Sequence, residues 1–218
     1  EKDFVNKVQD TIDRGGHALV PSFAVGRSQE IIDVLHEYKV EAPIYFDGMG
    51  QKVARVYMNN PSYLKNPKFL EKALNKINWI KNHKARKQAL NEPAIIICTS
   101  GMMQGGSVYA YLPSIYNDKN SSILLTGFQV EQTPGRGLLD TGKINLDGLT
   151  VKVKADVKHY DFSAHAGKSE LFKAIKKLNP EKVICVHGDK EVMKHFAKSI
   201  KAEGFTPVVP ELGQEIEL

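Results

Sequence analysis

Short, continuously apolar segments alternate along the chain with segments whose apolar residues recur at helical spacing. The clearest apolar segment is Ile95-Ile96-Ile97-Cys98, and a run without polar positions is typical of a strand covered by helices on both faces of a parallel sheet. Helical patterns separate it from strand-like segments at 44–46 and 123–126. The alternation predicts an α/β fold with a helix-flanked, mainly parallel sheet.

Two regions depart from this alternation. Residues 59–91 are rich in Lys and Asn, which predicts a lid or insertion of short surface helices rather than a sheet element. From Thr150 to Val157 the pattern has period two, as in a strand with one wet face. We therefore expect two domains, at 1–146 and 147–218, with a buried strand at 183–186 and edge strands in the tail.

The composition is that of a globular protein, with 42% hydrophobic residues and a net charge of +5. This basic excess gives weak support to a polyanionic partner. The sequence has no apolar run long enough for a membrane span and no signal-peptide pattern, so we expect a cytoplasmic protein without membrane contact. The chain begins at Glu1 without Met, and we expect it to be a piece of a longer protein. The two cysteines, Cys98 and Cys185, lie in apolar runs and predict neither a disulfide nor a Cys-based zinc site.

A glycine-bearing loop follows the apolar run at 95–98 and precedes a helix that the pattern predicts near 108–116. Backbone N–H groups at such a helix start, beside the Ser100 hydroxyl, are suited to binding a phosphate. Gly101 and Met102 belong to the same loop. A tight turn that needs glycine for backbone reasons explains the pattern equally well.

Two arginines occupy similar junctions between a strand and a helix. Arg27 lies in the first turn of a predicted helix, and Arg136 follows Pro134, which is suited to a first helical turn. A guanidinium there suits a phosphodiester, although for Arg27 a surface ion pair with Glu30 is slightly favoured when the residue is taken alone. Because the carboxyl ends of parallel strands meet at one edge, the three junctions predict a shared ligand crevice.

Two histidines each close a short strand-like run. His165 ends Asp161-Phe162-Ser163-Ala164-His165, and His187 ends Val183-Ile184-Cys185-Val186-His187. A histidine at the carboxyl end of a strand is held by rigid backbone beside a loop-lined cleft, where metal ligands and general acids are often found. A buried or surface structural histidine is the alternative for either one, but the pair favours a functional site.

Several of these motifs occur in an order that is informative as a whole. They are Gly15-Gly16, the segment 20–30, Thr99-Ser100-Gly101-Met102, Gly127-Phe128-Gln129, Gly135-Arg136, Phe162-Ser163-Ala164-His165 and Val186-His187-Gly188-Asp189. Together they resemble the β-CASP branch of the metallo-β-lactamase superfamily over nearly the whole chain. The chain is most similar to the archaeal and bacterial relatives of the cleavage and polyadenylation endonuclease, since the RNase J branch would have Ser-Gly-His where this chain has Ser163-Ala164-His165.

The resemblance implies a Rossmann-like β-CASP domain at 1–146 and the C-terminal part of a metallo-β-lactamase αββα domain at 147–218. It also implies a zinc-dependent ribonuclease that hydrolyses RNA phosphodiester bonds, in RNA decay or mRNA 3′-end processing. His165 matches the family histidine that contacts the scissile phosphate and protonates the leaving oxygen, and His187 matches a ligand of one of two zinc ions. Substrate contacts are then expected from Arg27, Ser100, Gly101, Met102, Arg136 and Ser163.

The other metal-binding motifs of the superfamily are missing from this sequence. A His-x-His-x-Asp-His cluster, a further His, a bridging Asp and an acidic motif are all expected upstream of its first residue. One His cannot hold zinc tightly, so we expect the chain by itself to bind metal incompletely or not at all and to be inactive. We also expect it to bind single-stranded RNA and to self-associate through exposed apolar surface.

Two other functions fit the residues. The first is a non-catalytic RNA-binding or scaffolding relative, which the presence of both His165 and His187 argues against. The second is an unrelated α/β module that binds a sugar or a mononucleotide. Binding of a mononucleotide without binding of RNA would favour that module, and cleavage activity of the longer protein would exclude the scaffold.

Overall fold

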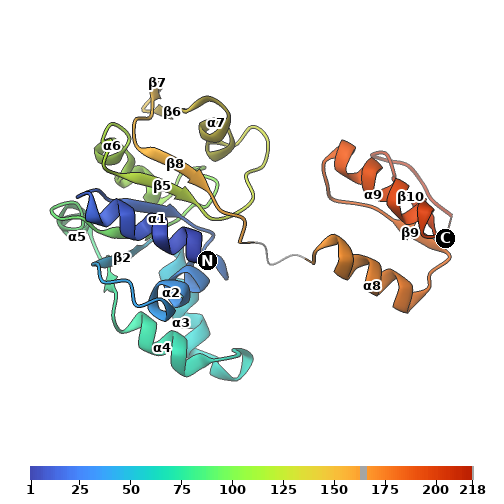
Figure 1. Cartoon of the computed structure of the whole chain (residues 1–218), viewed down its shortest axis with the longest axis horizontal. Helices are drawn as coiled ribbons and strands as arrows, with labels where there is room; N and C mark the ends of the chain where they lie inside the picture. The colour runs from blue at the N-terminus through green and yellow to red at the C-terminus, as the bar shows by residue number, and fades with distance from the viewer. Residues whose placement is uncertain (163–165, 218) are drawn as a thin grey trace. The chain divides into compact units, whose positions relative to one another are not determined.

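The computed structural model of the protein describes residues 1–162 and 166–217 of the 218-residue chain. The chain divides into two compact units, at 1–162 and 163–218, and each is described by itself. The first unit is an α/β unit in which helices cover a twisted sheet (Figure 1). Among the described residues no helix is both long and apolar enough to cross a membrane.

The sheet of the first unit has six strands in the order β3-β2-β4-β1-β5-β8, and every neighbouring pair is parallel. The strands are β1 (Ala18–Pro21), β2 (Ile44–Asp47), β3 (Asn78–Trp79), β4 (Ile95–Cys98), β5 (Ser122–Leu125) and β8 (Asp156–His159). The predicted mainly parallel sheet is confirmed.

Helices pack on both faces of this sheet. One face carries α1 (Lys2–Asp13), α2 (Arg27–Glu37), α3 (Met49–Asn59) and α4 (Pro67–Leu74); the other carries α5 (His83–Gln88), the 3-10 helix η2 (Ser107–Ala110), α6 (Leu112–Ile115) and α7 (Pro134–Thr141). In β4, Ile95 and Ile97 pack with the first set and Ile96 with the second. The strand is thus buried on both faces, as its unbroken apolar run predicted.

Two sequence-based expectations need correction in this unit. The helix expected at 108–116 is divided into η2 and α6, because Pro113 has no N–H for a continuous helix and instead lies in the first turn of a new one. The region 59–91 holds the 3-10 helix η1 (Pro61–Tyr63), α4 and α5 as expected, but it also adds strand β3 to the sheet. A two-residue strand has too few positions to show a period.

The region predicted to open the second domain lies within the first compact unit. Its period-two segment forms the end of a hairpin of β6 (Lys143–Leu146) and β7 (Leu149–Lys152), and then β8, which pairs with β5. The compact units therefore divide after Phe162 and not at the expected boundary of 146/147. The division into family domains at that boundary stays a prediction.

The second unit contains a small parallel sheet and two helices. Its elements are α8 (Lys168–Leu178), β9 (Lys182–Ile184), α9 (Lys190–Ala202) and β10 (Thr206–Val208). The buried strand expected at 183–186 is wrong, because Ile184 and Val186 are exposed. In the described part of the unit β9 has one neighbour, β10, so it lacks the cover of a central strand. The described tail after β10 forms no further strand.

The turn between α1 and β1 needs a glycine at one position. A Cβ on Gly16 would lie 1.8 Å from the backbone oxygen of Asn120, whereas a Cβ on Gly137 in α7 would meet nothing within 4 Å. We expect Gly16→Ala to lower the free energy of unfolding by about 2–3 kcal/mol, because backbone must move to admit the methyl group. The matched control, Gly137→Ala, should change it by no more than about 1 kcal/mol, in the stabilising direction. Urea unfolding measures both, and equal midpoints for the two variants would contradict the packing of this turn.

Candidate nucleic-acid interface

Three loops lie together at the carboxyl edge of the sheet. Strand β1 lies between β4 and β5 and is parallel to both, and Pro21 at the end of β1 pairs with Cys98 at the end of β4. The loops that follow these strands, at 22–26, 99–106 and 126–133, therefore leave the sheet side by side (Figure 1). The structure thus brings together the three junctions that the sequence placed at one edge.

Gln129 ties two of these loops to each other. Its Nε2 donates to the backbone oxygens of Gly101, at 3.1 Å, and Gly127, at 2.8 Å, and its side chain is buried. The N–H of Gly135 adds a second link by donating to the Met102 oxygen at 3.0 Å. Since buried hydrogen bonds of this kind fix loop backbones, the edge is a preorganised surface. The sequence placed Gln129 in the junction but gave no signal of this contact, which depends on long-range packing.

The first loop is joined to the third by two hydroxyl groups and by an aromatic ring. The hydroxyls of Ser22 and Thr126 are 3.2 Å apart and both residues are fully buried. The ring of Phe23 lies against Gly127, where a Cβ would come within 2.7 Å of it. Beside these buried ties, Phe128 exposes 57% of its surface. An exposed aromatic ring on a fixed loop can stack against a nucleobase.

Arg27 lies in the first turn of α2, where the sequence placed it, but it is not a surface residue. The residue is 9% exposed, its guanidinium donates to Glu30 at 2.6 Å, and its Cζ lies 5.4 Å from the centre of the Phe162 ring. Its Nε is buried without a hydrogen-bond partner among the described residues. The ion pair with Glu30, one of the two interpretations of the sequence, is therefore present, and it joins a buried Arg27 to an exposed Glu30.

Arg136 is the more exposed of the two arginines. It lies in the first turn of α7, whose N-cap Thr133 accepts a hydrogen bond from the Arg136 N–H. Its Nε donates to both carboxylate oxygens of Asp140, at 3.0 and 2.8 Å, and about half of each side chain is exposed. An ion pair this exposed adds little to stability.

The glycine-bearing loop differs from its expectation in one respect. It is followed by η2, a four-residue 3-10 helix, so the expected full helix start is absent there. The Ser100 hydroxyl donates to the Gly105 oxygen at 3.2 Å, Gly101 is buried against Phe23, and Met102 is partly buried. The tight packing around Gly101 supports the alternative in which the glycine is needed for close backbone approach.

A buried charge network lies beside this loop and was not predicted. Asp47, at the end of β2, accepts hydrogen bonds from Arg86 Nε at 2.7 Å and from the Tyr111 hydroxyl at 2.8 Å. The hydrogen bond to Asp47 raises the pKa of the Arg86 guanidinium, while burial and then the same carboxylate raise the pKa of the Tyr111 hydroxyl. Both groups therefore keep their protons and act as donors. The N–H of Met49, two residues after Asp47, donates to the Thr99 hydroxyl at 3.3 Å and links the network to the loop.

The histidines of the predicted catalytic site fall in or near the second unit. His165 and Ser163 lie outside the described residues. His187 is exposed, with a backbone φ of 64°, and follows the buried Cys185. In the described part of the chain no three His, Cys, Asp or Glu side chains lie close enough to hold a metal ion, so the residues described do not by themselves fit a zinc site.

Comparison with known proteins decides the family. Residues 28–138, about half of the chain, match the family described as the Beta-Casp domain. The chain belongs to the β-CASP family. Its residues 150–210 match a second family, described as the Zn-dependent metallo-hydrolase RNA specificity domain. The β-CASP resemblance inferred from the motifs is thereby confirmed.

Curated relatives of this β-CASP chain include several proteins named as ribonucleases. It is 38% identical to "Probable RNase MJ4" of Methanocaldococcus jannaschii, over 100% of this chain and 52% of the relative. It is 36% identical to "RNase aCSPSF2" of Saccharolobus solfataricus, over 100% of this chain and 44% of the relative. It is 35% identical to "Transcription termination factor FttA" of Pyrococcus horikoshii, over 92% of this chain and 34% of the relative. The chain thus spans about a third to a half of the length of these relatives.

Proposed function

We propose that this chain binds single-stranded RNA at the three tied loops of its carboxyl edge and supplies part of the active site of a zinc-dependent ribonuclease. The match to an RNA specificity domain of metallo-hydrolases and the names of the relatives support the class of substrate and of reaction. The observation that carries the proposal is the fixed edge itself, where the Gln129 hydrogen bonds hold adjacent loops and Phe128 stands exposed.

Within this proposal the two arginines contact phosphate groups. Arg136 would exchange its exposed pair with Asp140 for a phosphodiester, a change that conserves its charge-assisted hydrogen bonds. Arg27 would have to share its guanidinium with Glu30, and its Nε, which is buried without a partner among the described residues, would have to be uncovered before a ligand could reach it. Ser100, Gly101 and Met102 would line the path of the RNA backbone across the edge.

The catalytic roles follow the resemblance to the family. We propose His165 as the group that protonates the leaving oxygen and Ser163 as a contact to the substrate. We propose His187 as one zinc ligand in the longer protein, with the other ligands of two zinc ions supplied by residues outside this chain. The chain alone should therefore bind RNA without cleaving it.

RNA binding by the chain tests this proposal. Fluorescence anisotropy of a labelled 12-nucleotide single-stranded RNA should show saturable binding that weakens as salt rises. Arg136→Ala should weaken it roughly tenfold, the value of one charge-assisted contact. The matched control is Lys119→Ala, which removes an exposed positive charge before β5 at the opposite edge of the sheet. Equal losses in the two variants would show general charge attraction rather than a site at this edge.

A non-catalytic RNA-binding role would use the same surface. One relative is named as a transcription termination factor, a name that does not mention cleavage. Cleavage by the longer protein separates the two functions, because a scaffold would bind the same RNA without hydrolysing it. Self-association of the chain stays a prediction.

A further inference from the structure

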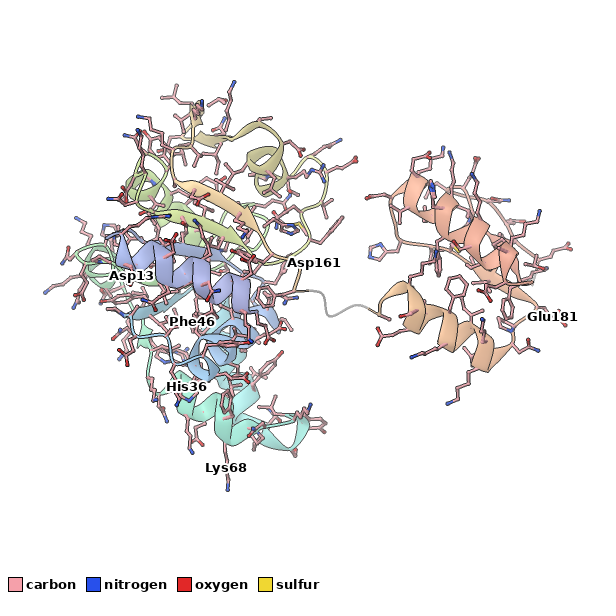
Figure 2. All side chains as sticks on the ribbon, viewed as in Figure 1. Asp13, His36, Phe46, Lys68, Asp161 and Glu181 are labelled. Carbon is pink, nitrogen blue, oxygen red and sulfur yellow. The ribbon has the colours of Figure 1, made fainter. Side chains whose placement is uncertain are left out.

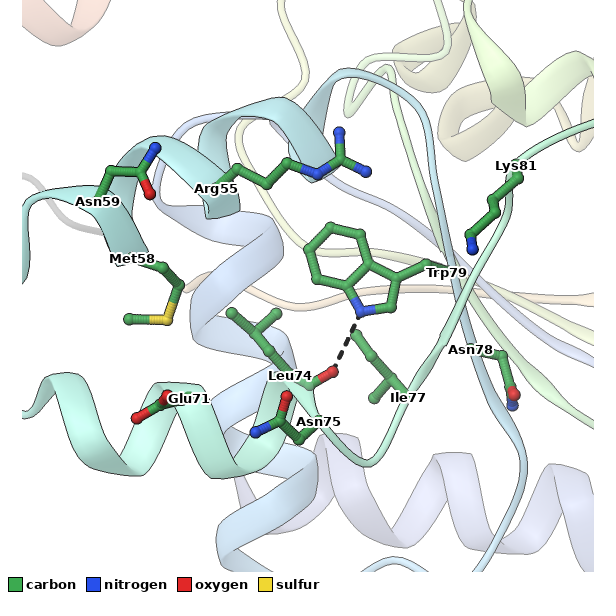
Figure 3. Close-up of a pocket in the computed structure, with 10 residues that line it drawn as sticks. All are labelled: Arg55, Met58, Asn59, Glu71, Leu74, Asn75, Ile77, Asn78, Trp79 and Lys81. Carbon is green, nitrogen blue, oxygen red and sulfur yellow. Dashed lines mark hydrogen bonds between the residues drawn. The ribbon is translucent and has the colours of Figure 1, made fainter.

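A second candidate binding site lies at the β3 edge of the sheet. Helices α3 and α4 and strand β3 border an open cavity of about 760 Å³, shown in Figure 3, whose lining includes Arg55, Glu71, Asn75, Asn78, Trp79 and Lys81. This volume is within the usual range for small-ligand pockets, about 300–1,000 Å³. None of the residues that line the cavity belongs to the three loops described above, so the cavity is distinct from that edge.

Trp79 is held in a fixed orientation at this cavity. Its Nε1 donates to the Leu74 oxygen at 3.1 Å, and its ring packs edge to face against Phe46 at 5.7 Å. The Cζ of Arg55 lies 5.2 Å from the centre of the same ring, and Figure 3 shows the guanidinium beside the indole. Trp79 is half-buried and Arg55 is exposed. The guanidinium of Arg55 therefore lies over the face of the indole, and this stacked pair is called the platform. Nucleobases stack on guanidinium planes as well as on aromatic rings.

The segment that supplies most of the cavity lining is strongly basic. Residues 59–91 hold eight Lys and Arg against a single acidic residue, Glu71, although the whole chain holds 30 against 25. The lysines of this segment are all exposed, and Lys68 extends from α4 into solvent (Figure 2). The positive charge of the chain is therefore concentrated in the segment that supplies most of the cavity lining. A basic surface beside an aromatic platform is the combination that binds single-stranded nucleic acid without sequence preference.

We propose that this cavity binds one base of a single-stranded RNA, with the neighbouring phosphates held by Lys81 and the lysines of the segment 59–91. The inference rests on RNA being the ligand of the protein, as proposed above. The base stacks on the platform of Trp79 and Arg55, and the amide groups of Asn75 and Asn78 are suited to its polar edge. An acidic peptide fits less well, because its carboxylates would leave the stacking platform of Trp79 and Arg55 without a partner.

Trp79 reports directly on this cavity because it is the only tryptophan of the chain. Titration of the whole chain with a six-nucleotide oligoadenylate should quench its fluorescence in a saturable way. Arg55→Ala should weaken this binding roughly fivefold or more, the lower end of the effect of losing one stacking partner. Arg55 is exposed on a helix, where alanine is well tolerated, and urea unfolding should confirm that the variant is folded. Lys119→Ala is the control and should leave the titration unchanged.

The outcomes separate this inference from the proposed function. In one outcome, anisotropy shows RNA binding while Trp79 fluorescence does not change and the Arg55→Ala variant binds RNA as tightly as the unchanged chain. That result would overturn the cavity site alone. Absence of any RNA binding would overturn both proposals. Quenching by a hexaglutamate peptide at the same concentrations as by RNA would assign the cavity to an acidic peptide and overturn the inference. Quenching by RNA that is weakened by Arg55→Ala and retained in Arg136→Ala would support it.

Discussion

Replacing Asp47 by alanine is expected to lower the free energy of unfolding by about 2–4 kcal/mol. The carboxylate is buried and accepts hydrogen bonds from Arg86 Nε at 2.7 Å and from the Tyr111 hydroxyl at 2.8 Å. Its removal leaves a buried hydroxyl and a partly buried guanidinium without their acceptor. The Arg86 side chain is 35% exposed and can turn toward water, so the loss should be smaller than for a fully buried ion pair.

Urea unfolding of four variants tests this network. Tyr111→Phe removes a single hydrogen bond and should cost about 1 kcal/mol. Combining Asp47→Ala with Arg86→Ala should cost clearly less than the sum of the separate changes, because the two side chains act on each other. Two results would contradict a stabilising role of this network at the end of β2. One is additive losses of unfolding free energy, and the other is an Asp47→Ala midpoint equal to that of the unchanged chain.

The largest effect on activity is expected from His165→Ala in the longer protein. Loss of a general acid usually lowers the rate by about 10²–10⁴-fold. RNA binding should change little, since the proposed contacts of Arg136 and the loops remain. Single-turnover cleavage of a labelled RNA at saturating enzyme measures this step without a contribution from binding.

Two other histidines serve as comparisons for this result. His195→Ala is a matched control, because His195 is exposed on α9 with its Nδ1 3.3 Å from the Glu191 oxygen of its own helix. It should leave the rate unchanged. His187→Ala should lower the zinc content of the longer protein, whereas His165→Ala should not. A His165→Ala enzyme with the rate of the His195→Ala enzyme would remove His165 from the proposed mechanism.

Local sequence patterns were sufficient to predict the architecture. The apolar run at 95–98 identified a strand covered on both faces, and the rule that parallel strands end at one edge brought the junctions of Arg27, Ser100 and Arg136 together. Neither inference needs knowledge of which side chains touch.

The features that were missed depend on contacts between residues far apart in the chain. Asp47 and Arg86 are 39 residues apart, and Gln129 is 28 residues from the Gly101 oxygen to which it donates. Arg27 is covered by the ring of Phe162, which is the last residue of the first unit in the sequence. No rule based on spacing along the sequence predicts such pairs. Strand β9 was wrongly predicted to be buried for a related reason, because an apolar run is buried only where other elements cover it.

Hydrogen exchange of the chain with and without single-stranded RNA tests whether RNA binds at the carboxyl edge, because it maps the bound surface without any substitution. We predict slower exchange on RNA binding in the loops at 22–26, 99–106 and 126–133. The turn at 118–121, at the opposite edge of the sheet, should exchange at the same rate in both samples. RNA that binds while leaving all three loops unprotected would contradict the assignment of the carboxyl edge as the RNA-binding surface.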